Sequence, residues 1–238
     1  MRVNVVLSPN QVDELYFTGK TAVVIDVLRA TSTILTALEN GAREIIPVAS
    51  LEFGAKISAN SFGGKIVRGG EKNMRKIEGF DLGNSPLEYT REVIEGKTVV
   101  FFTTNGSKAI VKTKFSKATY IAAFLNAAAV AEKLKAAGDD VEIVCSGRGG
   151  EFSYEDTICA GYIIKLLKSN DRTLRLKDSA QAALTLYEES AAKLNERVKN
   201  SEHGMLLSDA GFEEDINYCV RLNVTGLVPV FLSNSIKK

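Results

Sequence analysis

Histidine, cysteine and an excess of either charge are scarce in this chain of 238 residues, and each scarcity argues against a class of protein. With a single histidine, His203, a histidine-rich zinc site within one subunit is disfavoured, and a Ser-His-Asp triad would have to use that residue. We interpret His203, within Ser201-Glu-His-Gly204, as a surface or capping residue rather than a catalytic one. The three cysteines lack CxxC spacing, which favours a reduced, cytoplasmic protein over a disulfide framework.

Balanced charge and the absence of long apolar runs set further limits. Lys and Arg total 30 against 29 Asp and Glu, so the net charge of +1 argues against long-range attraction to nucleic acid or to an anionic membrane. No apolar run approaches the roughly 18 residues that a transmembrane helix needs, and Val3–Leu7 is too short for the core of a signal peptide. We therefore expect a cytoplasmic protein that binds neither nucleic acid nor membrane.

Several common phosphate-binding motifs are also missing. The chain has no GxxxxGK[ST] nucleotide loop, and Gly147-Arg-Gly-Gly150 is too short for GxGxxG. The turn after Cys145 lacks the five residues that separate cysteine from arginine in a cysteine-phosphatase loop. Asp26-Val-Leu-Arg-Ala-Thr31 superficially resembles the nucleophile turn of haloacid-dehalogenase phosphatases, but Leu28 stands in the place of their second aspartate. None of these mechanisms can be carried over intact.

The chain does contain a regular alternation of apolar runs of strand length with helical patterns. This alternation is typical of βαβ units and predicts an α/β fold with a largely parallel sheet and helices on both faces. The expected strands are Val3–Leu7, Thr21–Asp26, Glu44–Val48, Lys65–Arg68, Lys97–Thr103, Ala118–Ala122 and Val141–Cys145. The expected helices are Thr31–Asn40, Leu51–Asn60, Pro86–Glu95, Lys108–Lys112, Asn126–Ala137 and Asp156–Leu167.

The C-terminal third has a different pattern. We predict an α/β core over residues 1–170 that carries most of the site, and a helical C-terminal portion with a final strand over residues 171–238. Ser179–Asn200 has the apolar stripe of one long amphipathic helix, which is compatible with a homodimer, and a shorter helix is expected near Glu213–Leu222. Gly226–Leu232 is predicted to be an edge strand because Pro229 cannot donate a ladder hydrogen bond.

Three predicted strands end in short polar turns. Ala22–Ile25 leads into Asp26–Ile34, Thr98–Phe102 leads into Thr103–Ser107, and Val141–Val144 leads into Cys145–Gly150. Serine and threonine in such turns are often ordinary helix N-caps. Three such turns on one edge of one sheet are hard to explain by capping alone, and that edge is where open α/β sheets bind ligands. The composition of the turns suits a phosphate together with a cation.

The irregular segments supply the side chains for such a site. Mg²⁺ prefers hard oxygen ligands and needs only one or two carboxylates beside a phosphate. Arginine can contact phosphate oxygens in a bidentate manner, and the glycines at 147, 149 and 150 would let backbone N–H groups approach an anion. Helix capping and solvent-exposed ion pairs are the alternatives for each acidic residue. The segment Gly69–Pro86 has no helical or strand period and is long for a connection, which favours a functional loop over the site.

The chain resembles the 2-phosphosulfolactate phosphatases of the ComB type. The resemblance lies in five blocks, Asp26–Ile34, Gly69–Glu71, Gly79–Pro86, Thr103–Ser107 and Cys145–Asp156, with a weaker one at Asp215–Cys219. It implies a three-layer α/β/α fold and a Mg²⁺-dependent phosphatase that converts (2R)-2-phospho-3-sulfolactate to 3-sulfolactate and phosphate, a step on a route to coenzyme M.

The expected site residues fall within these blocks. The expected catalytic residues are Asp26, Arg29, Arg148 and Asp156, and the expected metal ligands are Asp26, Glu71, Asp81 and Glu155. The expected substrate-binding residues are Thr31, Ser32, Asn84, Ser85, Thr103, Thr104, Asn105, Gly106, Ser107, Ser146 and Gly147.

Mechanism and substrate are left open by the sequence. Either Asp26 forms an aspartyl-phosphate, or the metal and a carboxylate activate water for direct attack. The partner is expected to be a small phosphorylated 2-hydroxy acid, and phospholactate would satisfy most of the same contacts as phosphosulfolactate. A non-catalytic protein that binds a phosphorylated metabolite through the same turns is the alternative from another functional class.

Overall fold

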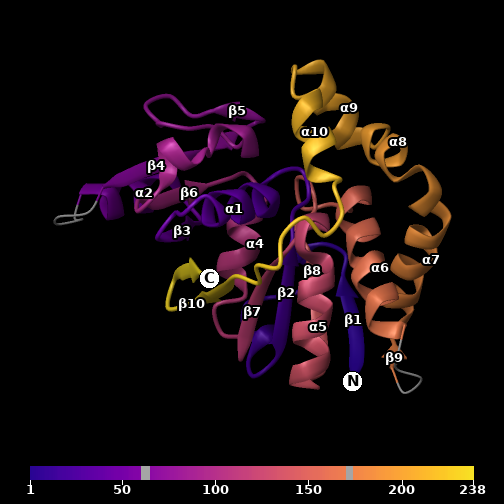
Figure 1. Cartoon of the computed structure of the whole chain (residues 1–238). Coiled ribbons are helices and arrows are strands. Elements are labelled where there is room, and N and C mark those ends of the chain that lie inside the picture. The colour runs from indigo at the N-terminus through magenta and orange to yellow at the C-terminus, as the bar shows by residue number, and fades with distance from the viewer. Residues whose placement is uncertain (60–64, 170–173) are drawn as a thin grey trace.

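The computed structural model describes residues 1–59, 65–169 and 174–238 and contains one mixed sheet (Figure 1). Its strands are β1 (Arg2–Val6), β2 (Thr21–Ile25), β3 (Glu44–Val48), β4 (Ile66–Lys72), β5 (Arg75–Lys76), β6 (Thr98–Phe102), β7 (Ala118–Ala122), β8 (Val141–Cys145), β9 (Arg175–Leu176), β10 (Val230–Leu232) and β11 (Ser235–Lys237). Their order is β5-β4-β6-β3-β11-β10-β7-β2-β8-β1-β9. The pairs that involve β5, β10 or β11 are antiparallel, and the others are parallel.

Helices connect most of the parallel strands. They are α1 (Ala30–Glu39), α2 (Leu51–Ala59), α3 (Arg91–Ile94), α4 (Gly106–Lys112), α5 (Ala127–Ala137), α6 (Tyr154–Lys168), α7 (Asp178–Ser190), α8 (Leu194–Lys199), α9 (Glu202–Asp209) and α10 (Glu213–Cys219). Among the described residues, no helix is both long and apolar enough to cross a lipid bilayer.

Side chains of the central strands alternate between two hydrophobic cores, one on each face of the sheet. Val23 and Ile25 of β2 belong to a core that also holds apolar residues of α5, α6 and α7. Ala22 and Val24 belong to a second core that holds apolar residues of α1 and α4. The helices therefore cover both faces, and the three-layer α/β/α prediction is confirmed.

The helices α1 and α4 lie between two halves of the sheet (Figure 1). Val99 and Phe101 of β6 share the second core with β2, although four strands stand between β6 and β2 in the sheet order. Val100 and Phe102 of β6 face the other way, toward α2. One half of the sheet contains β6 and the other contains β2 and β8. Because both halves pack against α1 and α4, the carboxyl ends of these three strands converge on one region.

The prediction of one long helix over Ser179–Asn200 is wrong. The structure has α7, a 3₁₀ turn over Ala191–Lys193 and then α8. The Ser190 hydroxyl donates to the Leu186 carbonyl oxygen at 2.7 Å, and such back-bonding weakens and bends a helix. The apolar stripe is still used, because α7 packs against α6 and β1.

The prediction of an edge strand at Gly226–Leu232 is also wrong. Pro229 immediately precedes β10, and β10 lies between β7 and β11. The Pro229 carbonyl oxygen accepts a hydrogen bond from the Ile121 N–H at 3.0 Å. The Ile121 carbonyl oxygen, for which proline has no donor, accepts from Asn126 Nδ2 at 3.0 Å instead. Ser233 and Asn234 both have positive φ, which closes a tight turn and lets β11 extend the sheet.

Smaller differences occur near the site. The predicted helix Pro86–Glu95 is a 3₁₀ turn, Pro86–Glu88, followed by the short α3, because Thr90 between them is extended. The predicted loop from Gly69 contains the end of β4 and all of β5, which form a hairpin. The predicted helix end at Asn60 and the predicted boundary between residues 170 and 171 lie outside the described residues.

Candidate active site

The three polar turns predicted from the sequence meet around a cavity of about 450 Å³. The Ser146 N–H, after β8, donates to the Ile25 carbonyl oxygen of β2 at 2.8 Å. The Gly149 N–H donates to Asn105 Oδ1 at 3.1 Å, which joins the turn after β8 to the turn after β6. The cavity is lined by Asp26, Leu28, Arg29, Glu71, Asn73, Met74, Asn84, Thr103, Thr104, Asn105, Arg148, Gly149, Glu151 and His203.

Asp26 lies at the end of β2 in the cavity wall. Its Oδ1 accepts a hydrogen bond from the Ala30 N–H at 3.0 Å, so the aspartate itself occupies the first free amide of α1. Burial raises the pKa of Asp26 even though this hydrogen bond acts in the opposite direction. A methyl group at Gly106 would clash with Asp26 Oδ2, so a glycine is needed for α4 to approach this carboxylate.

A further buried carboxylate, that of Asp156, lies close enough for the charge of Asp26 to raise its pKa. Asp156 Oδ1 accepts from the Val27 N–H at 2.8 Å, and its Oδ2 accepts from the Ser146 hydroxyl at 3.1 Å. Burial, followed by the charges of Asp26 and Glu155, raises the pKa of Asp156 well above the ordinary value. Asp156 therefore ties the turns after β2 and β8 together from below the cavity.

Replacing Asp156 with asparagine is expected to stabilise the metal-free protein at neutral pH. Because the pKa of Asp156 is raised in the folded state, the folded protein binds this proton more tightly, and the contribution of Asp156 to wild-type stability falls as pH rises above 3.8. The asparagine side chain would keep an acceptor for the Val27 N–H and remove the repulsion, a gain on the order of 1–2 kcal/mol at about pH 7.5. Urea unfolding in EDTA would measure it, and a gain that does not shrink toward about pH 4 would contradict the explanation.

Arg29 is held in a buried network supplied by the C-terminal helices. Its Nη1 lies 2.5 Å from Asp215 Oδ2 in α10, and Asp215 Oδ1 accepts from the Ser85 hydroxyl at 2.6 Å. The guanidinium carbon lies 4.1 Å from the centre of the Phe212 ring, and Nη2 donates to the Met74 carbonyl oxygen at 3.2 Å. These contacts fix the orientation of Arg29 while it still lines the cavity.

Glu71 approaches the same cavity from β4. Its Oε1 accepts from the Thr104 N–H at 2.8 Å, and its Oε2 accepts from the Met74 N–H at 2.7 Å. Asn73 and Met74 form the tip of the β4–β5 hairpin with positive φ values, and both line the cavity. The expected functional loop thus contributes a hairpin tip and a carboxylate to the site.

His203 and Arg148 also line the cavity. His203 Nδ1 lies 3.1 Å from Glu155 Oε1, and Glu155 is nearly completely buried. Burial alone would raise the pKa of Glu155, but the hydrogen bond and charge of His203 prevail and lower it. Arg148 is more exposed and forms an ion pair with Glu202.

Asn84 contributes an unpaired acceptor to the wall. Its Oδ1 is buried and has no hydrogen-bond partner among the described residues. A buried carbonyl oxygen without a donor costs about 1–3 kcal/mol. The atom therefore marks a position at which a bound molecule or its water can supply a donor.

Comparison with known proteins assigns the family. The family model described as 2-phosphosulpholactate phosphatase matches residues 6–234. The chain belongs to this family. Three curated relatives carry the name "Probable 2-phosphosulfolactate phosphatase": one from Clostridium beijerinckii, 40% identical over 240 residues that cover 99% of each chain, one from Clostridium perfringens strain SM101, 43% identical over 100% of this chain and 96% of its own, and one from Clostridium novyi, 42% identical over 97% of each chain.

Several hydroxyl side chains within the blocks that resemble this family make local structural contacts, and of these residues only Thr103 is among the described residues of the cavity wall. The hydroxyls of Thr31 and Ser32 donate to the carbonyl oxygens of Asp26 and Val27, respectively. The Ser107 N–H donates to the Thr103 hydroxyl, and the Ser107 hydroxyl donates to the Val48 carbonyl oxygen at 2.8 Å. These side chains satisfy backbone groups where the polar turns meet the helices.

Other expected site residues also lie outside the wall of the 450 Å³ cavity. Asp81 Oδ2 accepts from the Arg68 N–H at 2.7 Å and lies 3.7 Å from the Arg68 guanidinium, so its carboxylate is directed toward Arg68. The remaining expected residues support wall residues from behind or line other surfaces; they are Ser85, Gly106, Ser146, Gly147, Glu155 and Asp156.

Sequence reasoning missed Asp215 as a functional residue and placed His203 on the surface. Asp215 lies 186 positions from Arg29, and its only signal was the weak C-terminal block of family resemblance. The interpretation of His203 as a surface or capping residue is wrong, because Ser201 caps α9 through the Gly204 N–H and the His203 side chain lies against Glu155. The partner of His203, Glu155, is contributed by α6, which the capping motif could not indicate.

The donor set at the cavity fits Mg²⁺. Within the part of the chain that the structure describes, no three His, Cys, Asp or Glu side chains gather closely enough to hold a metal ion by themselves. Mg²⁺ needs fewer protein ligands, because water and substrate phosphate complete its shell. Asp26 and Glu71 face the same cavity, and the charge of Glu71 contributes to the raised pKa of Asp26. A cation between these carboxylates would relieve that repulsion.

Proposed function

We propose that this protein is a Mg²⁺-dependent phosphatase that hydrolyses (2R)-2-phospho-3-sulfolactate to 3-sulfolactate and phosphate in the cytoplasm, on a route to coenzyme M. The observation that carries the proposal is that Asp26, Arg29 and Asn105, from distant parts of the chain, line one cavity. The names of the relatives, which describe a phosphoric monoester hydrolase, support the same reaction class.

The cavity needs a cation to bind such a substrate. Among the described residues that line the cavity, the carboxylates of Asp26, Glu71 and Glu151 outnumber the guanidinium groups of Arg29 and Arg148. Both arginines are already paired, with Asp215 and Glu202. Asp26 and Glu71 would hold Mg²⁺, which neutralises phosphoryl oxygens when bound. A phosphorylated acid would otherwise meet a wall of like charge.

The chain's own groups would then orient and stabilise the phosphoryl group. Arg29 is fixed by Asp215 and Phe212, so its remaining donors face the cavity without large reorganisation. Asp26 is placed either to attack phosphorus and form an aspartyl-phosphate or to accept a proton from attacking water. In both routes an Asp26 carboxylate oxygen takes part, as the nucleophile in the first and as the proton acceptor in the second.

We also propose that His203 protonates the leaving group. Its Nδ1 is directed at the buried Glu155, so Nε2, on the other side of the ring, is the nitrogen left for the cavity. When the ester P–O bond breaks, its electron pair goes to the C2 oxygen, and that oxygen takes the Nε2 proton. Water returns a proton to the imidazole during turnover. The contact between Nδ1 and the Glu155 carboxylate orients the ring for this transfer.

Replacing His203 with glutamine is expected to lower kcat for an alkyl substrate by about 10²–10⁴-fold, the usual contribution of a general acid. An aryl phosphate such as 4-nitrophenyl phosphate has a leaving group that needs little protonation, so its hydrolysis should fall far less. Steady-state kinetics with both substrates measures the difference. An equal loss on both would show that His203 has only a structural role.

Phosphate release tests the proposed function. The purified protein with 2-phosphosulfolactate should release phosphate in Mg²⁺ and lose that activity in EDTA, with recovery on adding Mg²⁺ back. The same assay with 2-phospholactate tests the alternative substrate. If neither compound is hydrolysed but either binds in calorimetry, the protein is a phosphometabolite-binding protein instead of an enzyme.

A further inference from the structure

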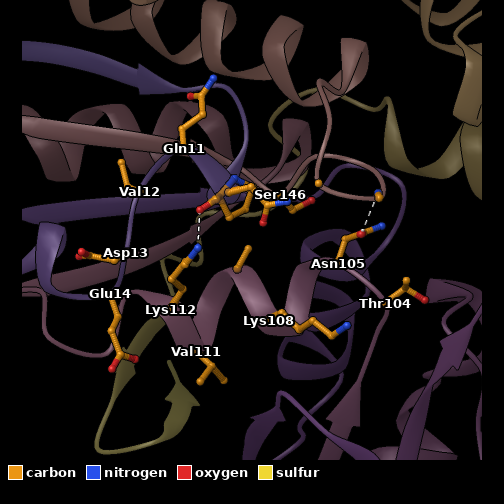
Figure 2. A pocket seen from close by; sticks show the side chains of 15 residues that line it. Gln11, Val12, Asp13, Glu14, Thr104, Asn105, Lys108, Val111, Lys112 and Ser146 are labelled. Carbon is orange, nitrogen blue, oxygen red and sulfur yellow. Dashed lines mark hydrogen bonds between the residues drawn. The ribbon is translucent and has the colours of Figure 1, made fainter.

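A second and larger cavity, of about 970 Å³ (Figure 2), shares lining residues with the first. Its wall combines α4 with the N-terminal segment of residues 9–14, which follows β1. Thr104, Asn105 and Gly149 line both cavities. The hydrogen bond between the Gly149 N–H and Asn105 Oδ1 therefore lies on the border between them.

Lys108 stands beside this border on α4. It is three residues after Asn105, so the two side chains share a helix face. Figure 2 shows the Lys108 side chain directed toward the end of the cavity where Thr104 and Asn105 lie. Its Nζ lies 6.0 Å from the centre of the Phe102 ring, at the end of β6.

The other charged groups in this wall are already engaged. Lys112 Nζ donates to the Pro9 carbonyl oxygen at 2.5 Å, and Glu14 forms an ion pair with Lys114 at 2.5 Å. Asp13 Oδ1 accepts from the Tyr16 N–H at 2.9 Å. Lys108, by contrast, has no carboxylate within 4.0 Å in the described ranges of the chain. Its charge is therefore available to a ligand.

We propose that Lys108 binds the terminal anionic group of a substrate whose phosphate occupies the first cavity. This inference rests on the proposed phosphatase function and deepens it. Phosphosulfolactate carries a carboxylate and a sulfonate besides its phosphate, whereas the first cavity offers only two arginines, both paired. A tail that passes over the border meets the ammonium group of Lys108 and the side-chain amide of Asn105, whose Oδ1 already accepts from the Gly149 N–H.

The charges also limit the length of the tail. Figure 2 shows Asp13 and Glu14 at the opposite end of the second cavity from Thr104 and Asn105. An anionic group carried further along the cavity would leave Lys108 and approach these carboxylates. The wall therefore favours a substrate with a short tail that ends in an anion, such as a sulfonate or carboxylate on C3, over one with a longer tail.

Substrate pairs test this directly. The ratio of kcat/KM for 2-phosphosulfolactate to that for 2-phospholactate, which has a methyl group in place of the sulfonate-bearing carbon, isolates the tail. We expect the wild-type ratio to be about tenfold or more, the effect of one charge-assisted hydrogen bond. Lys108→Met should bring the ratio close to one by slowing only phosphosulfolactate, and Lys108→Arg should retain most of the preference.

Lys112→Met is the matched control, because it removes the same charge from the same helix and cavity wall. It should leave the ratio unchanged. A wild-type ratio near one, or a ratio that Lys108→Met leaves unchanged, overturns the proposal for Lys108. Hydrolysis of phospholactate would still support the phosphatase function in that case. If the wild type hydrolyses neither compound, the proposed phosphatase function is wrong. Calorimetry with 3-sulfolactate and lactate then tests the role of Lys108 in binding, and Lys108→Met should weaken the binding of 3-sulfolactate but not that of lactate.

Discussion

Replacing Asp26 with asparagine is expected to lower kcat by at least about 10³-fold, the scale of losing a nucleophile or an essential charged group. Asparagine has the same shape and can accept the Ala30 N–H through its own carbonyl oxygen, so the start of α1 should be preserved. What disappears is the negative charge that either attacks phosphorus or holds the cation. Phosphate release from 2-phosphosulfolactate at saturating Mg²⁺ measures the loss.

Two further measurements interpret that result. Urea unfolding should show Asp26→Asn to be at least as stable as the wild type without metal, since burial and the charge of Glu71 raise the pKa of the native carboxyl. An acyl-phosphate trapped on the wild type and absent from the variant would separate attack by Asp26 from activation of water. Near-normal turnover by Asp26→Asn would reduce the residue to a helix cap.

Replacing Arg29 with methionine is expected to lower the free energy of unfolding by about 3–5 kcal/mol, because it leaves Asp215 as an uncompensated charge in the interior. Both side chains of this pair are almost completely buried. The same change removes the best-oriented cation of the cavity, so kcat/KM should fall by about 10²-fold or more. Urea unfolding and steady-state kinetics measure the two effects separately.

Arg148→Met supplies the matched control. Arg148 also lines the cavity and also pairs with a carboxylate, but its pair with Glu202 is exposed, so stability should change by only about 0–1 kcal/mol. The double variant Arg29→Met/Asp215→Leu should recover much of the stability while activity stays low. If Arg29→Met is no less stable than Arg148→Met, the buried network does not have the role assigned to it.

The position of the site could be predicted from the sequence, because it depends on strand ends. Asp26, Thr103 and Ser146 directly follow apolar strands, and parallel topology brings such residues to one edge. The roles of individual hydroxyls could not be predicted in this way. Thr31 and Ser32 look like ligands in a linear sequence, yet each has a backbone carbonyl within its own turn that it satisfies first.

Contacts between distant segments were the other limit. Nothing local indicates that Asp215 meets Arg29 or that Glu155 meets His203, since each pair depends on how α9 and α10 pack above the sheet. The position of β10 beside β7 also depends on contacts between distant segments. A proline next to a short apolar run favours an edge by propensity, and tertiary pairing with β7 and β11 prevailed over that preference.

The most direct test of the account is a crystal structure of the protein with Mn²⁺ in place of Mg²⁺ and orthovanadate in place of the phosphoryl group. We predict an anomalous difference peak within bonding distance of the Asp26 and Glu71 carboxylates, with vanadate beside Arg29 in the 450 Å³ cavity. A metal peak elsewhere on the protein, with Asp26 and Arg29 unliganded, would contradict the central claim that these strand-end turns form one site for an oxyanion and a divalent cation.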